Sequence, residues 1–503
     1  MLASVASATL LGVDGRPVSV EVHVAGGLPA FTLVGLPDTA CRESRDRVRA
    51  ALSSTGVAFP QRRITVNLAP SGVRKNGAGL DLAVAVGILA AHGDLPADAL
   101  AGVGLLGELG LDGSVRRVPG MVPLVDALPG EVAVVPACCA GEAELVGRHR
   151  VRAVASLAEL VAALRGDAPW PDPPPRVGQE DAVVEPDLAD VRGQPVARLA
   201  LEVAAAGAHH LLLAGPPGAG KTMLARRLPG LLADLPPAVA LEVTKAHSAA
   251  GLALPSSGLV RRPPWRAPHH GASVVSLIGG GTSTMRPGEI TLASGGVLFL
   301  DELAEFPRHV LDALRQPLEE GVVRVSRARA SVAYPARFLL VGAMNPCACG
   351  EGGPPGSCRC SDAARARYAA RVSGPLLDRF DLRLTVQRPD PAALLGGPPG
   401  ESSAAVAARV AGARALARTR GVGANAELPG WSLDVVAPLD TAATVVLERE
   451  LRCGSLSARG LARVRRVART LADLGGREGP LGEEDVCLAL QLRTELHHGR
   501  MVA

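Results

Sequence analysis

Aromatic residues and net charge are both scarce in this chain of 503 residues. Phe, Trp and Tyr make up only 2% of it, so its cores have to be built from Ala, Val and Leu. The 53 Lys and Arg residues nearly cancel the 49 Asp and Glu residues, which leaves a net charge of +4. This balance excludes a histone-like polycation, and any contact with nucleic acid must come from a local patch. A hydrophobic content of 48% with 20% charged residues also excludes a disordered chain.

Long apolar runs are absent as well. The longest, 82–91, is interrupted by Gly87 and is typical of a buried helix, not of a membrane span. The N-terminus lacks the basic start and the cleavage pattern of a signal peptide. The nine cysteines are odd in number, which indicates reduced thiols, or a metal site where they cluster. We therefore expect a cytoplasmic protein with no membrane partner.

The composition changes twice along the chain. Proline dominates 168–175, ahead of an acidic stretch, and this combination is typical of a semi-rigid spacer. A weaker break, rich in Gly and Pro, spans 396–403. The length predicts about three domains. The expected units are a first domain at 1–165, a Pro-rich linker at 166–186, a core at 187–395 and a C-terminal domain at 396–503.

Hydrophobic periodicity predicts a multidomain α/β protein. The first unit mixes helical stretches with alternating strand-like runs, which predicts an α+β domain, with helices at 39–53 and 80–91 and strands at 18–24, 63–68 and 132–135. The core alternates short apolar strands with helices, the pattern of a parallel sheet covered on both faces. The last unit is helical, and its segment 456–474 carries an apolar stripe opposite its arginines.

A phosphate-binding loop follows an early strand of the core. The apolar run 211–214 leads into Gly-Pro-Pro-Gly-Ala-Gly-Lys-Thr, a complete G-x-x-x-x-G-K-[ST] motif between a strand and a helix. Backbone N–H groups of such a loop surround a polyphosphate, Lys221 reaches the β- and γ-oxygens, and Thr222 ligates Mg²⁺. Lys221 is one of only three lysines in the chain. The predicted ATP-binding residues are Gly215, Pro216, Pro217, Gly218, Ala219, Gly220, Lys221 and Thr222.

Two more strands are expected to bring polar side chains to this loop. The apolar run 297–300 ends in Asp301 and Glu302, so both carboxylates lie at the carboxyl edge of the sheet. We predict that Asp301 holds Mg²⁺, mostly through water, and that Glu302 polarises the attacking water. The run 338–343 is followed by Asn345, whose amide is suited to positioning that water. In isolation, Asn345 before Pro346 also reads as a turn residue.

With these elements in this order, the chain resembles an AAA+ ATPase, and more narrowly the bacterial magnesium-chelatase-like YifB/ComM family. The resemblance runs through all three units and implies a P-loop AAA+ core followed by a C-terminal α-helical lid. It is carried by the stretches 27–37, 63–70, 265–270 (Trp-Arg-Ala-Pro-His-His), 286–290, 313–319, 344–350 (Met-Asn-Pro-Cys-Ala-Cys-Gly), 373–381 (Ser-Gly-Pro-Leu-Leu-Asp-Arg-Phe-Asp) and 456–459.

The resemblance implies a homo-oligomeric ring, a hexamer, with ATP at the subunit interfaces. Arg379 matches the family's arginine finger, which reaches a neighbour's γ-phosphate and stabilises the charge that develops in phosphoryl transfer. The alternative is an ion pair with Asp378 or Asp381. Arg459 matches the second sensor arginine, placed on the lid so that the helical unit and the nucleotide move together.

The segment 321–334 reads as a hairpin that faces the pore of such a ring. Arg324, Arg327 and Arg329 lie near its tip, and arginines in a central channel track a phosphate backbone whatever its base sequence. Together with the family resemblance, on which this expectation mostly rests, they predict DNA, single-stranded or branched, as the partner. The alternative is a solvated edge hairpin whose arginines prevent aggregation.

The first unit resembles a Lon-protease-like domain of the ribosomal S5 domain 2-like fold. Active members carry a nucleophilic serine where this chain has Gly79, and a catalytic lysine at a place that falls near Val122. Ser71 and Ser114 lack the expected context. Without an activated hydroxyl and its amine base there is no acyl-enzyme route. We expect a binding or ring-building domain that has no protease substrate.

Four of the cysteines cluster just after Asn345, as two C-x-C pairs. Four thiolates spaced in this way can close tetrahedrally on Zn²⁺, so we predict a structural zinc site. Free reduced cysteines are the alternative. The residues concerned are Cys347, Cys349, Cys358 and Cys360.

Taken together, these patterns predict an ATP- and Mg²⁺-dependent motor that encircles DNA, a helicase or branch-migration enzyme acting in recombination or in uptake of DNA. One rival is a magnesium-chelatase-like metal-insertion subunit, which lacks a Lon-like first domain. Another is an activator ATPase of the alternative sigma factor, whose Gly-Ala-Phe-Thr-Gly-Ala loop is missing from this sequence. A nucleotide-switched scaffold without translocation is the third.

Overall fold

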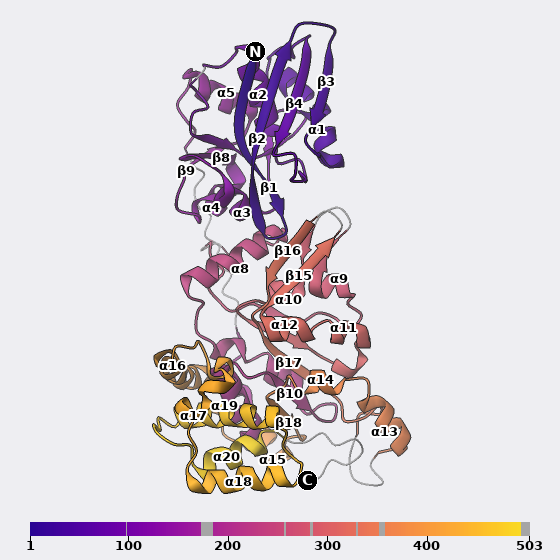
Figure 1. Cartoon of the computed structure of the whole chain (residues 1–503), viewed down its shortest axis with the longest axis vertical. Coiled ribbons are helices and arrows are strands. Elements are labelled where there is room, and N and C mark those ends of the chain that lie inside the picture. The colour runs from indigo at the N-terminus through magenta and orange to yellow at the C-terminus, as the bar shows by residue number, and fades with distance from the viewer. Residues whose placement is uncertain are drawn as a thin grey trace.

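Three sections follow one another along the long axis of the molecule in the computed structural model (Figure 1). The structure describes residues 1–493 except 97, 173–184, 256–257, 282–284, 328–329 and 352–357. The N-terminal section lies at one end, the C-terminal helical section at the other, and the core between them. Most of the expected linker, 173–184, lies outside the described residues. No helix in the described ranges combines the length and the apolar character needed to cross a bilayer.

The N-terminal section is built on a mixed seven-stranded sheet. Its strand order is β3-β4-β2-β1-β5-β8-β9, antiparallel at β1, β2 and β4 and parallel from β1 through β5 and β8 to β9. The strands are β1 (Leu2–Leu11), β2 (Asp14–Ala25), β3 (Ala30–Val34), β4 (Arg63–Ala69), β5 (Val103–Leu105), β8 (Val132–Pro136) and β9 (Arg150–Val154). A separate short ribbon pairs β6 (Glu108–Leu109) with β7 (Val115–Arg116).

Five helices accompany this sheet: α1 (Thr39–Ser54), α2 (Asp81–His92), α3 (Met121–Ala127), α4 (Ala140–Glu144) and α5 (Leu157–Arg165). Helix α2 is almost entirely buried. It lies directly on the sheet because Gly87 has no side chain, and a Cβ at that position would come within 2.7 Å of Val22 Cγ2. The mixture of strands and helices expected for this section is therefore present.

The core contains a parallel five-stranded sheet in the order β11-β14-β17-β10-β18. Every residue of its three central strands is buried. Alternate residues serve opposite faces, because Leu211 and Leu213 belong to one apolar cluster and Leu212 and Ala214 to another. The strands are β10 (Leu211–Ala214), β11 (Trp265–Arg266), β14 (Val297–Leu300), β17 (Leu339–Met344) and β18 (Leu382–Thr385).

Helices cover both faces of this sheet, so the fold class expected for the core is confirmed. Parallel strands share one carboxyl edge, where the polar residues that follow β10, β14 and β17 meet. The helices are α6 (Pro195–Gly207), α7 (Lys221–Ala225), α8 (Pro237–Ala249), α9 (Val274–Ile278), α10 (Glu289–Leu292), α11 (Arg308–Asp312), α12 (Arg315–Glu320), α13 (Asp362–Ala369), α14 (Gly374–Leu377) and α15 (Pro391–Gly396).

The C-terminal helical section shares its apolar core with α6 and one face of the sheet. Its helices are α16 (Ser403–Thr419), α17 (Leu433–Val436), α18 (Thr441–Arg452), α19 (Ala458–Leu474) and α20 (Glu483–Gln491). The side chain of Ser457 caps α19 by accepting a hydrogen bond from the Gly460 N–H. The apolar stripe expected on this helix is buried, at Val464, Val467, Ala468 and Leu471.

The N-terminal section meets the core at helix α3 and at the β1–β2 turn, among other places. Helix α3 lies against α8, where Lys245 Nζ donates to Asp126 Oδ2 at 2.5 Å and Gly120 N–H donates to the Ser248 carbonyl at 2.9 Å. The second contact is made by the hairpin of β15 (Val322–Arg327) and β16 (Ala330–Pro335). Its Val332 lies so close to the β1–β2 turn that a Cβ on Gly12 would come within 2.4 Å of it.

Candidate nucleotide-binding site

The predicted phosphate loop connects β10 to α7 at the carboxyl edge of the sheet. Gly218 and Gly220 have φ values of +78° and +86°, which only glycine adopts without strain. A Cβ on Gly215 would lie 2.2 Å from the Val386 carbonyl oxygen, so the loop needs glycine there because it runs close to the chain that follows β18. The glycines thus allow the tight turn that the motif predicts.

The ammonium group of Lys221 donates hydrogen bonds to the phosphate loop itself. Its Nζ donates to the carbonyl oxygens of Gly215 at 2.7 Å and Pro216 at 3.0 Å, and to Oδ1 of Asn345 at 3.1 Å. Burial lowers the pKa of Lys221, and the negative charge of Asp301 opposes that effect. The end of β17 and the phosphate loop are therefore joined through this lysine.

The residues that follow β14 complete the site. The Thr222 hydroxyl donates to Oδ2 of Asp301 at 2.7 Å, and Oδ1 of the same carboxylate accepts from the Glu302 N–H at 2.9 Å. The hydroxyl and the carboxylate are within hydrogen-bonding distance of each other. Both are hard oxygen donors, which Mg²⁺ prefers beside substrate phosphates. Thr222 and Asp301 therefore fit the metal that the motif predicts.

Glu302 is held in an unusual way. Its backbone is left-handed, with φ +50° and ψ +46°, a conformation that costs a non-glycine residue about 1 kcal/mol or more. Its Oε2 lies 3.0 Å from Nδ1 of His270, and the ring of His269 lies 4.0 Å from that of His270 with the two planes tilted by 35°. In the sequence, His270 stands out only as part of the Trp-Arg-Ala-Pro-His-His stretch, which carries the family resemblance but predicts no role for this residue.

These groups border a cavity of about 300 Å³ beside the phosphate loop. Both carboxylates and the Thr222 hydroxyl face it, so it is a polar cavity next to a phosphate site. Its lining consists of Thr222, Arg226, Trp265, Ala267, Pro268, His269, His270, Phe299, Asp301 and Glu302.

Two further side chains hold the phosphate loop from outside, and sequence reasoning missed both. Gln194, left-handed at φ +53°, donates from Nε2 to the Ala219 carbonyl at 2.8 Å. Arg388 donates from Nε to the Pro217 carbonyl at 3.2 Å. Both come from segments far from the loop in sequence, where neither belongs to a recognisable motif.

Arg379 follows α14 and points to another part of the surface. Its guanidinium pairs with Glu319 of α12, whereas Asp378 and Asp381, the partners considered from the sequence, pair with Arg383 and Arg463. Burial, and then the positive charges of neighbouring arginines, lower the pKa of Arg379. The alternative of an ion pair with Asp378 or Asp381 is therefore wrong for this state.

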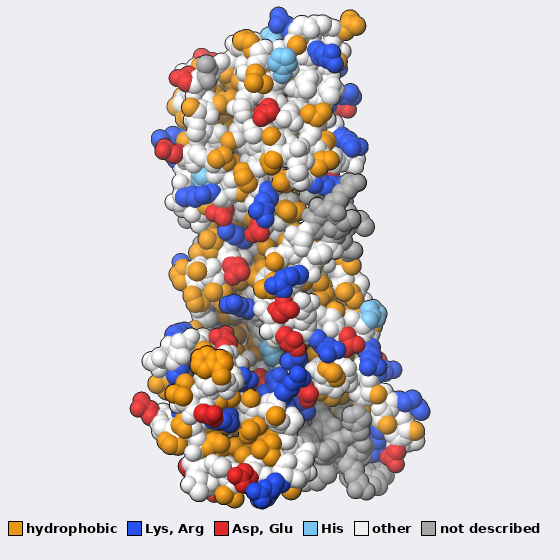
Figure 2. Space-filling model, viewed as in Figure 1, with side chains coloured by type: hydrophobic (Ala, Val, Ile, Leu, Met, Phe, Trp, Pro, Cys, Tyr) orange, Lys and Arg blue, Asp and Glu red, His pale blue; other side chains and the backbone are white. Residues whose placement is uncertain are grey.

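The second sensor candidate, Arg459, lies with Arg379. Both are close enough for their charges to repel, and Arg463, one turn later on α19, donates to the Arg379 carbonyl at 3.3 Å. Among the described residues, those that line the cavity beside Thr222 include no member of the helical section. Figure 2 shows basic side chains gathered where the helical section meets the core. The two sensor candidates therefore belong to one surface, apart from the chain's own nucleotide cavity.

The predicted hairpin is present, but only part of its arginine set is described. Arg324 is exposed and pairs with Glu320 at the end of α12. The side chain of Arg327 and the whole of Arg329 lie outside the described residues.

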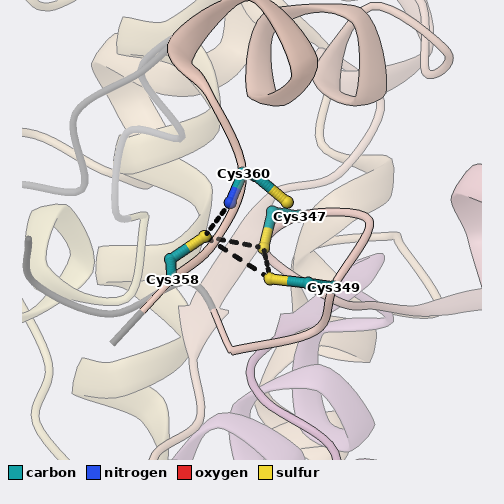
Figure 3. A group of neighbouring side chains, drawn as sticks. All are labelled: Cys347, Cys349, Cys358 and Cys360. Carbon is teal, nitrogen blue, oxygen red and sulfur yellow. Dashed lines mark hydrogen bonds between the residues drawn. The ribbon is translucent and has the colours of Figure 1, made fainter. Parts of the chain in front are cut away.

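The predicted cysteine cluster comes together immediately after Asn345 (Figure 3). Its four sulfur atoms lie within 4.8 Å of one another, and none of the four is in a disulfide. Cys347 is buried, Cys349 exposed, and Cys358 and Cys360 half-buried. Among the described residues, these four cysteines are the group of potential ligands, of the types His, Cys, Asp and Glu, that lie close enough together to hold a metal ion.

In the N-terminal section, the position expected for a nucleophile is tightly enclosed. A Cβ on Gly79 would lie 3.0 Å from Val118 Cγ1, and Val122 is buried. Ser114 donates its hydroxyl hydrogen to Asp112, and Ser71 is exposed on a turn.

Comparisons with known proteins cover nearly the whole chain. Three family models match, described as "Subunit ChlI of Mg-chelatase" over residues 20–136, "Magnesium chelatase, subunit ChlI" over 187–394 and "Magnesium chelatase, subunit ChlI C-terminal" over 400–493. An uncharacterized protein of Mycobacterium tuberculosis is 46% identical over 496 residues, or 97% of each chain. The uncharacterized protein YifB of Escherichia coli is 43% identical over 92% of each chain. The competence protein ComM of Haemophilus influenzae is 42% identical over 95% of this chain and 94% of its own.

Proposed function

The chain belongs to the magnesium-chelatase-like family that includes YifB and ComM, and from this premise we propose that it is an AAA+ ATPase whose ring acts on DNA. Its cofactors are ATP and Mg²⁺, with Zn²⁺ at the four-cysteine cluster. Residues 187–395 form the ATPase core, 396–503 a helical lid and 1–165 a Lon-like domain that does not cleave proteins. Residues 166–186 link the first two.

The observation that carries the ATPase proposal is that Lys221 and Thr222 contact the residues that follow β17 and β14. Lys221 Nζ already bonds Asn345, and Thr222 bonds Asp301. When ATP enters, Lys221 exchanges the carbonyls of its own loop for the β- and γ-phosphate oxygens. Thr222 and Asp301 hold Mg²⁺, which when bound neutralises charge on those phosphates.

The attacking water is handled by two side chains. Glu302 polarises it by accepting a hydrogen bond, and the Asn345 amide orients it towards the γ-phosphorus. Before this, Glu302 has to leave His270, to which it is paired across 3.0 Å. Its side chain borders the cavity and is 57% exposed, so a water can reach the carboxylate.

Arg379 and Arg459 act on the ATP of a neighbouring subunit. They lie together at one surface, whereas the cavity beside Thr222 is lined by other elements. A guanidinium supplied across an interface stabilises the charge of the transferring phosphoryl group. Each hydrolysis event therefore depends on two subunits in head-to-tail contact. A closed ring completes every such site, and we propose a hexamer.

DNA is proposed as the substrate of the motor. Support comes from the similarity to ComM, a competence protein, and from the arginine-bearing hairpin, whose Arg324 is exposed. Arginines at 324, 327 and 329 would contact phosphates without reading bases. The activity is helicase or branch migration in recombination or transformation.

A metal-insertion motor is the second candidate, because all three matching family models carry the description of magnesium chelatase subunit ChlI. The two candidates share their ATP chemistry, so only the substrate separates them. Stimulation of ATP hydrolysis by forked or four-way DNA supports the DNA motor. The absence of stimulation by any DNA would favour metal insertion or a nucleotide-switched scaffold.

The ATPase proposal is tested with Glu302→Gln in the full chain. This variant should bind a fluorescent ATP analogue as the wild type does, yet hydrolyse ATP about a hundredfold more slowly, because the amide polarises water poorly. Glu242→Gln, an exposed carboxylate on α8, is the matched control and should hydrolyse ATP normally. Full turnover by Glu302→Gln would remove Glu302 from the mechanism.

The DNA proposal is tested with Arg324→Ala/Arg327→Ala/Arg329→Ala. Loss of these charges should weaken binding to branched DNA and flatten its dependence on salt concentration, because fewer counterions are released. Arg452→Ala is the control, since this arginine is exposed on α18 and pairs only locally with Glu448.

A further inference from the structure

The four-cysteine cluster has a geometry that suits one metal ion better than disulfides. The sulfur atoms of three of these cysteines are separated by 3.2 Å for Cys347–Cys349, 3.4 Å for Cys349–Cys358 and 3.5 Å for Cys347–Cys358. Zn–S bonds of about 2.3 Å at tetrahedral angles separate neighbouring sulfurs by about 3.8 Å. These three sulfurs therefore need to move apart by only a few tenths of an ångström, and the sulfur of Cys360 lies within 4.8 Å of them. All three separations are well beyond the S–S bond of about 2.05 Å that a disulfide requires.

Zinc is the metal that this donor set favours. Four thiolates in a tetrahedron select Zn²⁺ or iron, not Mg²⁺ or Ca²⁺, and a closed set of four protein ligands is typical of a structural zinc site. Cys349 is exposed, so the ion has a path of entry. The guanidinium of Arg365 on α13 hydrogen-bonds Cys358 and offsets part of the negative charge of such a centre.

The cluster is also in direct contact with the phosphate site. Cys347 lies two residues after Asn345, which accepts from Lys221. Gly350, between the first two cysteines and the rest of the loop, lies against Pro217, because a Cβ there would be 2.8 Å from Pro217 Cγ. Its φ of +86° is a second reason for glycine at this position.

A second bridge runs from the same loop to the same proline. Glu351 pairs with Arg388 at 3.2 Å, and Arg388 donates to the Pro217 carbonyl at 3.2 Å. The segment that carries Cys347 and Cys349 therefore touches the phosphate loop at Pro217 through a ring contact and an ion pair, and reaches Lys221 through Asn345.

We infer that this cluster binds a structural zinc ion that fixes Asn345 and the phosphate loop in place, so that ATP binding and hydrolysis depend on the metal. The inference rests on the proposed ATPase function. The ion would give the four thiolates one common partner and so tie Cys358 and Cys360 to the segment that contacts Pro217 and carries Asn345. The ligands are Cys347, Cys349, Cys358 and Cys360.

The first test is metal content. The purified full chain should contain one zinc ion per chain by elemental analysis, and Cys358→Ser/Cys360→Ser should contain none. Cys138→Ser/Cys453→Ser, which removes two exposed cysteines outside the cluster, is the matched control and should keep its zinc. A wild-type protein without metal, or one that holds iron instead, overturns the assignment.

The second test links the metal to ATP and does not depend on a folded variant. Stripping zinc from the wild type with a chelator should weaken binding of a fluorescent ATP analogue and lower kcat about tenfold or more, since an orienting group is displaced. Adding zinc back should restore both. Unchanged binding and turnover in the stripped protein overturn the coupling. Zinc-loaded protein that hydrolyses no ATP would instead contradict the proposed function and leave the metal site standing.

Discussion

His210, at the start of the phosphate-loop strand, makes the core sensitive to acid. Its Nδ1 accepts a hydrogen bond from the Leu340 N–H at 3.1 Å, and burial lowers its pKa to about 4. In the unfolded chain the ordinary histidine pKa of about 6.5 applies. Between these two values the unfolded state binds more protons than the folded state, so the free energy of unfolding must fall as the pH is lowered through this window.

We expect this histidine to account for up to about 3 kcal/mol of stability lost between pH 6.5 and pH 4. His210→Asn keeps an acceptor for Leu340 but does not titrate, so its urea denaturation midpoint should depend less on pH over that range. His309→Asn, at an exposed site on α11, is the control and should keep the wild-type dependence. Equal pH dependence in wild type and His210→Asn would assign the acid sensitivity to other groups.

Some residues of the candidate nucleotide site belong to short sequence motifs, whereas others can be recognised only from their contacts in the folded chain. Lys221 and Thr222 belong to one short motif, and Asp301 follows an apolar strand, so their place at the sheet edge could be predicted from the sequence. His270 and Gln194 could not, because each acts through contacts with residues that are not its neighbours in the chain. Such contacts depend on how strands and loops meet in three dimensions.

At the scale of elements, helix α19 holds the segment that carries Arg379. Arg463 donates to Asp381 Oδ1 and to the Arg379 carbonyl, and His209 lies 3.5 Å from the other Asp381 oxygen. Although burial works against it, His209 and Arg463 hold the pKa of Asp381 far below its usual range. The carboxylate therefore stays charged and buried between the sheet and the helical section.

Arg463→Ala should destabilise the protein by about 3 kcal/mol, because it leaves the buried Asp381 carboxylate without its main partner. It should also slow ATP hydrolysis while ATP binding is kept, since Arg379 loses its backbone anchor. Chemical denaturation and steady-state ATPase assays measure the two effects. Arg452→Ala, which breaks an exposed pair with Glu448, should change neither; an equally stable Arg463→Ala protein would show that α19 does not anchor this segment.

The elements themselves were largely predictable, but their assembly was not. The strands at 211–214 and 297–300 coincide with β10 and β14 because an apolar run between turn signals is enough to define a buried parallel strand. The hairpin of β15 and β16 was also expected. Its packing of Val332 beneath the β1–β2 turn was not, because it joins residues more than 300 positions apart.

At the scale of the whole molecule, the nucleotide cavity and the surface of Arg379 belong to different parts of one subunit. Thr222 and Glu302 border the cavity, whereas Arg379 and Arg459 lie together beside α19. In a single chain, Arg379 pairs with Glu319. If a ring forms, that pair has to open so that Arg379 can reach the γ-phosphate of the next subunit, which couples hydrolysis to assembly.

This arrangement predicts that two inactive variants restore each other. Lys221→Ala cannot bind ATP, and Arg379→Ala lacks the finger, so each alone should be inactive. In a mixed ring, a Lys221→Ala subunit supplies an intact Arg379 to the site of an Arg379→Ala neighbour. Equal mixing should therefore restore about a quarter of the wild-type ATPase rate, since one interface in four has both parts.

A second mixture of variants shows whether Arg459 acts on the ATP of its own subunit or of the neighbour. If Arg459 serves the neighbour's ATP, as its place beside Arg379 suggests, Arg459→Ala mixed with Lys221→Ala should recover activity to the same degree. If it serves its own subunit's ATP, no site in that mixture is complete and the rate stays at background. Lys221→Ala mixed with Glu302→Gln is the negative control. Each of these subunits lacks a residue that acts on its own ATP, so no site in the mixture is complete. A mixture of Lys221→Ala and Arg379→Ala that also stays at background, in rings shown to exchange subunits, would contradict a shared active site.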